Sequence, residues 1–245
     1  MSRDDGRDGD RLRPPRPLRL PTAADLATFS VCLRGACGGY GVAVATARPN
    51  VGALVPYVSE RGAVATQARV DTTLGARTLE RLGRGEPVAQ AIDDLLAGDP
   101  DRALRQLHGV DAGAVHAVTG ERCVPFAGHL ASPGVSVAGN MLAGPEVLAA
   151  MLEAAADGAR LDIGERLLRV LEAGQAAGGD KRGKQSAALL AASPEPRLHH
   201  NLRVDDHPDP VAELRRLKGV MDEQTELLRA SYGEEGVRLF SRVRR

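Results

Sequence analysis

The hydrophobic and polar positions of the chain follow two patterns, one typical of strands and one typical of helices, which occur in separate blocks along the sequence. Short apolar runs bounded by glycine favour strands, and leucines that recur every three or four residues favour helices. The predicted strands are 28–33, 42–46, 51–58, 62–68, the two arms of a hairpin within 110–118, 135–139, 185–192 and 198–204. The predicted helices are 72–82, 86–97, a short one that starts at 99, 145–156, 162–176 and 208–218. Because strands and helices come in separate blocks, the order favours a layered α+β protein over a doubly wound α/β fold.

Both ends of the chain differ from this patterned region. Residues 1–20 hold Arg, Asp, Pro and Gly with little apolar content, which predicts a disordered tail. Beyond Gly219, charged residues with scattered leucines predict a helical tail that packs on the domain or on a partner. We therefore expect an N-terminal tail or pro-segment over 1–27, one folded domain over 28–218 and a C-terminal helical tail over 219–245.

Composition and charge exclude several classes of partner. The 245 residues carry 32 basic and 32 acidic side chains, so no overall positive charge attracts nucleic acid. Aromatic residues make up 2% of the chain, which argues against base-stacking surfaces and leaves the core to Ala, Val and Leu. No apolar run reaches the roughly 18 residues of a membrane span, and the N-terminus lacks the apolar segment of a secretory signal. We expect a cytoplasmic protein with no nucleic-acid or membrane partner.

The three cysteines favour the same compartment. Cys32, Cys37 and Cys123 are an odd number in a chain large enough to fold without disulfides, which is typical of reduced thiols. Cys32 and Cys37 could form half of a metal site, but no second pair with suitable spacing follows. Cys123 near His129 leaves a thiol nucleophile as an alternative. We expect neither a metal nor a cofactor.

Thr28 is the first candidate for chemistry, because it leads a strand that enters a glycine-rich turn. If the preceding peptide bond were cut, the Thr28 hydroxyl could attack a carbonyl while the new α-amino group accepted its proton. An α-amine with a pKa of roughly 7.7–8.0 suits that task near neutral pH. The alternative is a β-branched residue that simply begins a strand.

Three further segments could line the same site. Gly139 and Asn140 end a predicted strand, where a main-chain amide and a side-chain amide are suitable oxyanion donors; alternatively Asn140 forms a turn or caps the next helix. Thr66 and Gln67 end another strand. The basic loop 178–186 could bind a carboxylate or phosphate, or be a solvated turn. Its candidate substrate-binding residues are Asp180, Arg182, Gln185 and Ser186.

Several segments together resemble one family. They are Thr28-Phe29-Ser30, 41–45, 62–68, 138–144, 173–187 and Asp205-Asp206-His207-Pro208-Asp209-Pro210. They are similar to the domain-of-unknown-function family 1028, which resembles the N-terminal nucleophile (Ntn) hydrolases in fold. The resemblance covers about residues 28–218 and implies an α+β fold, a four-layer αββα sandwich of the Ntn hydrolase type, in which Thr28 is the nucleophile.

The chain departs from the family pattern in two places. Family members commonly carry the threonine directly after the initiator Met, whereas 27 residues precede Thr28 here and no Met lies between Met1 and Met141. Either the tail is cleaved, or translation starts at a non-Met codon near Leu26, or the amine is never freed. Residues 69–73 also differ from the family, which puts the substrate contacts of that loop in question.

Three functions follow from these observations. The first is an Ntn-type amidohydrolase that cleaves an amide or peptide bond in a small substrate, with Thr28 as nucleophile, Gly139 and Asn140 as oxyanion donors, and a homo-oligomeric assembly. The second is a non-catalytic binding or assembly module on the same fold. The third is a thiol enzyme that depends on Cys123.

Overall fold

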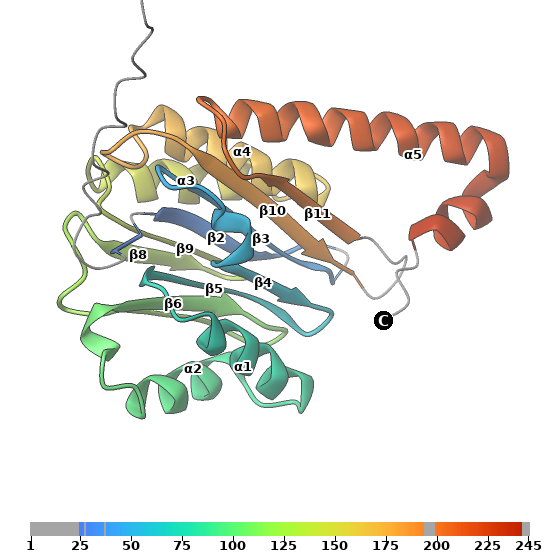
Figure 1. The fold of residues 1–245 in the computed structure, drawn as a ribbon. Helices are drawn as coiled ribbons and strands as arrows, with labels where there is room; N and C mark the ends of the chain where they lie inside the picture. The colour runs from blue at the N-terminus through green and yellow to red at the C-terminus, as the bar shows by residue number, and fades with distance from the viewer. Residues whose placement is uncertain (1–24, 27, 37, 194–198, 242–245) are drawn as a thin grey trace, which may run out of the picture.

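The computed structural model describes residues 25–26, 28–36, 38–193 and 199–241, which form an α+β fold with two antiparallel sheets (Figure 1). The five-stranded sheet has the order β1-β5-β6-β7, with β4 also paired to β5. Its strands are β1 (Asp25–Leu26), β4 (Pro56–Ser59), β5 (Gly62–Arg69), β6 (Arg105–Val110) and β7 (Val115–Thr119). The six-stranded sheet has the order β11-β10-β3-β2-β9-β8. Its strands are β2 (Thr28–Arg34), β3 (Tyr40–Thr46), β8 (Gly128–Ser132), β9 (Val135–Asn140), β10 (Ser186–Ala192) and β11 (His199–Val204).

Helices cover the outer faces of both sheets. In Figure 1, α1 and α2 lie against the five-stranded sheet, and α3 and α4 lie against the six-stranded sheet. Their bounds are α1 (Thr72–Gly83), α2 (Val88–Ala97), α3 (Glu146–Asp157), α4 (Ile163–Ala176) and α5 (Pro210–Ser241), with short 3-10 turns η1 (Val51–Ala53) and η2 (Arg102–Leu104). α5 packs on α4, β10 and β11 and then extends past the sheets.

The alternation of side chains along β2 shows how the two faces of the six-stranded sheet differ. Phe29, Val31 and Leu33 pack in the cluster that contains the leucines of α4. Cys32 instead belongs to the cluster between the two sheets, with Val and Ala side chains from β3 and β5. Successive residues of a strand point to opposite faces. The even-numbered residues of β2, Thr28 and Ser30 among them, therefore face the other sheet.

Small residues let these layers approach closely. A Cβ atom added to Gly41 of β3 would lie 2.5 Å from Leu167 Cδ1 of α4, and one added to Gly109 of β6 would lie 2.7 Å from the carbonyl oxygen of Ala63. Neither distance is compatible with ordinary packing. The scarcity of aromatic side chains thus accompanies a core in which glycine and alanine set the spacing between elements.

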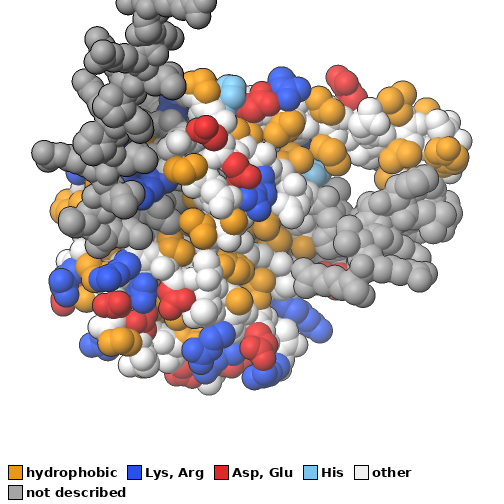
Figure 2. Space-filling view, viewed as in Figure 1, with side chains coloured by type: hydrophobic (Ala, Val, Ile, Leu, Met, Phe, Trp, Pro, Cys, Tyr) orange, Lys and Arg blue, Asp and Glu red, His pale blue; other side chains and the backbone are white. Residues whose placement is uncertain are grey.

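The charged residues on and beside α1 form a solvated face. Figure 2 shows Lys, Arg, Asp and Glu side chains gathered over α1 and α2. There Arg81 Nη1 lies 2.8 Å from Glu86 Oε1, and Arg84 pairs with Glu80.

On α5 the exposed large hydrophobics are Val220, Met221, Leu227 and Tyr232. The homo-oligomer stays a prediction.

Most predicted elements are present, with local corrections. The predicted strand over 51–58 was wrong in its first half, because 51–53 forms η1 and pairing begins only at Pro56. The short helix expected from 99 is the 3-10 turn η2, and β8 had not been predicted. Asp71 caps α1: its carboxylate accepts from the Thr73 amide at 2.9 Å. Pro208 does not open the last helix, which starts at Pro210 and runs unbroken across the expected boundary at 218–219.

The predicted N-terminal tail lies outside the described residues except for Asp25 and Leu26. These two residues form β1 and pair with Arg69 and Ala68 of β5. Within the described part of the chain, no helix is long and apolar enough to cross a membrane.

Candidate functional site

Thr28 begins a row of polar residues that crosses one end of the six-stranded sheet. It pairs with Asn140 of β9. On its other side the last pair between β2 and β3 is Phe29 with Ala45, so Thr28 and Thr46 occupy the next positions, and Thr46 pairs with Ser186 of β10. Each of the four is at most 2% exposed. Because paired residues share a face, all four side chains point toward the five-stranded sheet.

Ser30 connects the row to a polar network buried between the sheets. Its hydroxyl donates to Gln67 Oε1 of β5 at 2.7 Å, and it lies 2.8 Å from His108 Nε2 of β6. The other ring nitrogen, His108 Nδ1, lies 2.9 Å from Ser136 Oγ of β9. Each of these four residues is fully buried, so the network joins four strands, two from each sheet, without contact with solvent.

Gln106 extends the network to Asn140. Gln106 Oε1 accepts from Gln67 Nε2 at 2.7 Å and from Asn140 Nδ2 at 3.2 Å. Gln106 Nε2 lies 2.9 Å from the carbonyl oxygen of Gly139. The orientation of the Asn140 amide, one of the predicted oxyanion donors, is thereby set by a side chain from the opposite sheet.

His108 is held in its neutral form. Burial lowers the pKa of His108 to about 3, with a smaller contribution from nearby His129. A neutral imidazole carries a proton on one ring nitrogen only, so it donates to one of its two serines and accepts from the other. The site between the sheets is therefore polar but uncharged at neutral pH.

The backbone is strained directly beside two of these side chains. Ala68 follows Gln67 with φ 65°, and Met141 follows Asn140 with φ 51°. Residues with a Cβ rarely adopt the left-handed region, at a cost of order 1–3 kcal/mol each, and such residues concentrate at functional sites. Both strands thus end in an unfavourable conformation at the same end of the space between the sheets.

Asp25 and Leu26, the described residues before Thr28, belong to the other sheet. β1 pairs with β5 in the five-stranded sheet, whereas Thr28 begins β2 in the six-stranded sheet. In the uncut chain Thr28 is 0% exposed. Cleavage before Thr28 would separate β1 from β2 and free an α-amine at the end of the polar row.

The basic loop lies at the same end of the sheet, and Asp180 ties it to the end of β3. Asp180 Oδ2 accepts from the Ala47 amide at 2.8 Å, and Oδ1 accepts from the Arg182 amide at 2.9 Å. The Arg182 guanidinium pairs with the same carboxylate at 3.0 Å. Asp180 is 3% exposed and also bridges to Leu142, two residues after Asn140. Asp180 therefore holds the loop in place beside the polar row.

The other polar groups of this loop also bond within the chain. Gln185 Nε2 donates to Asp206 Oδ1 at 3.1 Å on the exposed side, and its role in substrate binding stays a prediction. Ser186 points inward, and its hydroxyl accepts from the Val51 amide at 3.1 Å. Lys184 Nζ lies 3.3 Å from Asp209 Oδ2. Arg182 and Lys184 of this loop therefore pair with different carboxylates, those of Asp180 and Asp209.

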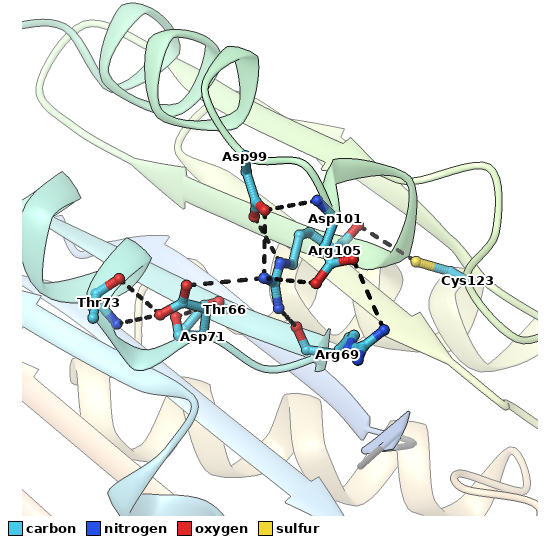
Figure 3. Close-up of polar contacts among 8 residues, drawn as sticks. All are labelled: Thr66, Arg69, Asp71, Thr73, Asp99, Asp101, Arg105 and Cys123. Atoms are coloured by element: carbon cyan, nitrogen blue, oxygen red, sulfur yellow. Dashed lines mark hydrogen bonds and ion pairs between the residues drawn. The ribbon is translucent and has the colours of Figure 1, made fainter. Parts of the chain in front are cut away.

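Thr66 and Gln67 cannot line one cleft, because neighbouring residues of a strand face opposite ways. Gln67 faces the polar network, whereas the Thr66 hydroxyl donates to the carbonyl of Asp71 at 3.3 Å, next to α1 (Figure 3). The same close-up shows Arg105, whose Nε lies 2.7 Å from Asp99 Oδ2 and whose Nη1 donates to the Arg69 carbonyl at 2.6 Å. The loop over 69–73 is thus braced by ion pairs and a helix cap.

Cys123 and His129 contact different groups. The Cys123 thiol donates to the carbonyl of Arg105 at 3.4 Å (Figure 3). His129 Nδ1 lies 2.9 Å from the Thr119 hydroxyl. Burial lowers the pKa of His129, which makes it a weaker base. These contacts give no support to a Cys123 nucleophile. Cys37, the second half of the considered metal pair, lies outside the described residues.

Sequence reasoning missed four residues of the network: Ser30, Gln106, His108 and Ser136. The signal was present in β6, where Gln106 and His108 alternate with Leu107 and Gly109. Alternation usually indicates that the polar residues face solvent. Here both faces are buried, so the polar residues face a second sheet.

Comparisons with known proteins agree with the resemblance drawn from the sequence. A family model described as "Family of unknown function (DUF1028)" matches residues 28–214. The crystal structure of protein SPO2555 from Silicibacter pomeroyi, which carries the same family label, is similar with a TM-score of 0.73 and 33% sequence identity. The alignment covers 79% of this chain and 88% of that one. None of the curated proteins matches. The chain therefore belongs to the DUF1028 family, whose function is unknown.

Proposed function

We propose that the protein is an N-terminal nucleophile amidohydrolase that cleaves an amide or peptide bond in a small substrate. In this proposal the two sheets and their flanking helices are the αββα sandwich of the Ntn hydrolases. One observation carries it: Thr28, at the start of β2, stands beside Asn140 in a buried polar row, while the residues before it pair with the opposite sheet. A cut at the 27–28 bond would expose the hydroxyl and the amine together.

The chemistry follows from that cut. The freed α-amine accepts the proton of the Thr28 hydroxyl, and the oxygen attacks the substrate carbonyl carbon. The Asn140 side-chain amide, with the Gly139 main-chain amide beside it, would donate to the resulting oxyanion. The carbon–nitrogen bond breaks, the amine leaves with the proton, and an ester remains on Thr28. Water then hydrolyses the ester and regenerates the hydroxyl.

The buried network supports this mechanism by positioning its donors. Gln106 accepts from both Asn140 and Gln67, so neither amide can rotate without breaking a buried hydrogen bond. Preorganised donors that need no reorientation are the main source of oxyanion stabilisation. Asp180 and Ser186 lie at the same end of the sheet and form the floor next to Thr28 in this proposal, with Arg182 as the polar contact for substrate.

An electrophilic probe tests the proposal without a known substrate. A β-lactone acylates a nucleophilic hydroxyl, so incubation followed by peptide mass spectrometry should find the adduct on a peptide that begins at Thr28. Thr28→Ala should abolish labelling. Thr46→Ala is the matched control, because Thr46 lies in the same buried row without a route to a free amine. Labelling that survives Thr28→Ala, or moves to Cys123, would contradict the assignment.

A non-catalytic binding or assembly module is the second candidate. The burial of Thr28 in the uncut chain favours it, since the hydroxyl is covered from substrate and the Thr28 nitrogen, held in a peptide bond, cannot act as the base. Full biological function of a Thr28→Ala strain, together with an intact 27–28 bond, would support the module and exclude the amidohydrolase.

A further inference from the structure

A second site lies at the opposite end of the sheets. A cavity of about 800 Å³ opens where β2 ends, some 20 Å along the strand from Thr28 at roughly 3.3 Å per residue. The turn between β6 and β7, the turn between β8 and β9 and the start of α4 surround it. Its lining includes Arg34, Ala112, Asp111, Ser132 and Arg166.

Arg166 is a buried cation on the wall of this cavity. It is 7% exposed, and its guanidinium donates only to main-chain oxygens: Nε to Ala155 at 2.8 Å and Nη1 to Arg34 at 3.2 Å. Among the described residues no carboxylate lies within ion-pair distance of Arg166. Burial lowers the pKa of Arg166, which shows that its surroundings disfavour the charge. A buried cation normally has an anionic partner.

Arg34 is the second arginine that lines the cavity. Its Nη1 donates to the carbonyl of Ala112 at 2.8 Å, and within the described parts of the chain it too has no carboxylate within 4 Å. Nε and Nη2 of Arg34 and Nη2 of Arg166 carry no hydrogen bond among those residues. Both arginines therefore line this cavity with donors that the described residues do not use.

Asp111 is the carboxylate that lines the cavity, and both of its oxygens already accept hydrogen bonds from main-chain amides. Its Oδ1 accepts from the amides of Gly113 at 2.8 Å and Ala114 at 2.7 Å, and its Oδ2 accepts from the Val88 amide at 2.7 Å. These three bonds hold it against the backbone of its own turn. Asp111 thus reduces the positive potential of the cavity without supplying a partner for either arginine.

The helix ends near Arg166 offset little of its charge. The Ala155 carbonyl belongs to the last turn of α3, where the helix dipole contributes about half a negative charge. Arg166 itself lies in the first turn of α4, where the dipole has the opposite sign. The contributions of the two helix dipoles largely cancel, so the positive charges of Arg34 and Arg166 remain.

We propose that this cavity binds a small organic anion that carries a carboxylate or phosphate group, with Arg34 and Arg166 as its cationic lining. Guanidinium forks are suited to both groups, because each presents two oxygens at the right spacing. The Ser132 hydroxyl, on the β8–β9 turn, offers a further donor. The site is separate from Thr28 and does not depend on the amidohydrolase proposal.

Calorimetric titration of the full chain tests this site. Inorganic phosphate and succinate are the two probes, each added at constant ionic strength set with chloride, to separate phosphate from carboxylate recognition. We expect saturable binding of at least one probe. Arg34→Gln should weaken it about tenfold or more, because a charge-assisted pair of hydrogen bonds is lost. Arg34 is exposed, so this variant should fold normally.

Arg77→Gln is the matched control, since Arg77 is an exposed arginine on α1 away from the cavity. It should bind like the unmodified chain. Arg166→Lys keeps the buried charge but loses the fork, and it should also weaken binding while circular dichroism stays unchanged. The proposal is overturned if neither probe binds saturably, if Arg34→Gln binds like the unmodified chain, or if Arg77→Gln loses as much affinity as Arg34→Gln.

Discussion

Acidification should destabilise the fold through His108. The folded state holds His108 neutral with a pKa of about 3, against 6.5 for an exposed histidine. Between these values the unfolded chain binds a proton that the folded chain excludes, so stability falls as the pH falls. From pH 7 to pH 5 this one group should cost about 2 kcal/mol. Below pH 3 the folded state binds the proton too, and the loss levels off.

Urea unfolding at pH 7 and at pH 5, followed by far-ultraviolet circular dichroism, measures the effect. Because the pKa of His129 is also lowered, the loss in the unmodified chain includes a contribution from that group. The informative quantity is the difference between the unmodified chain and His108→Gln, which keeps an amide in the network but cannot be protonated. The pH-dependent loss should shrink by about 2 kcal/mol in that variant.

His116→Gln removes a histidine from β7, outside the buried network, and supplies the control. This variant should keep the loss that belongs to His108, because the network is untouched. Equal pH dependence in His108→Gln and in the unmodified chain would refute the reasoning. It would mean that His108 is hydrated or paired with a negative group in solution.

Two further predictions concern packing and the basic loop. Gly109→Ala should destabilise the fold by roughly 1–3 kcal/mol, because its Cβ would meet the Ala63 carbonyl at 2.7 Å. Gly83→Ala meets nothing within 4 Å and should raise stability by up to about 1 kcal/mol; urea midpoints of both variants check the pair. Asp180→Ala should cost about 1–3 kcal/mol in the same assay, because it leaves the partly buried Ala47 amide without its carboxylate acceptor, and a midpoint equal to that of the unmodified chain would contradict this.

The sequence predicted the polar residues at the strand ends better than the buried network behind them. Thr28 and Asn140 could be assigned because each stands at the end of a patterned strand, and the sheet register then brings them together. The prediction placed Thr66 with Gln67, although strand geometry turns them to opposite faces. His108 could not be assigned because the pattern of β6 does not reveal that both of its faces are covered.

The cavity at Arg34 and Arg166 shows a different limit. The two residues are 132 positions apart, and neither stands in a motif. Only the packing of α4 near the end of β2 brings the two residues to the lining of one cavity. Single-sequence patterns describe local elements, whereas an unpaired charge becomes visible only when every neighbour is known.

The N-terminal residue of the mature protein tests the central claim most directly. Protein purified from its own source should be examined by intact mass spectrometry and N-terminal sequencing. The proposal predicts a chain that begins at Thr28 with a free α-amine. An intact 27–28 peptide bond in the functional protein would contradict it, because Thr28 would then have neither its base nor an accessible hydroxyl.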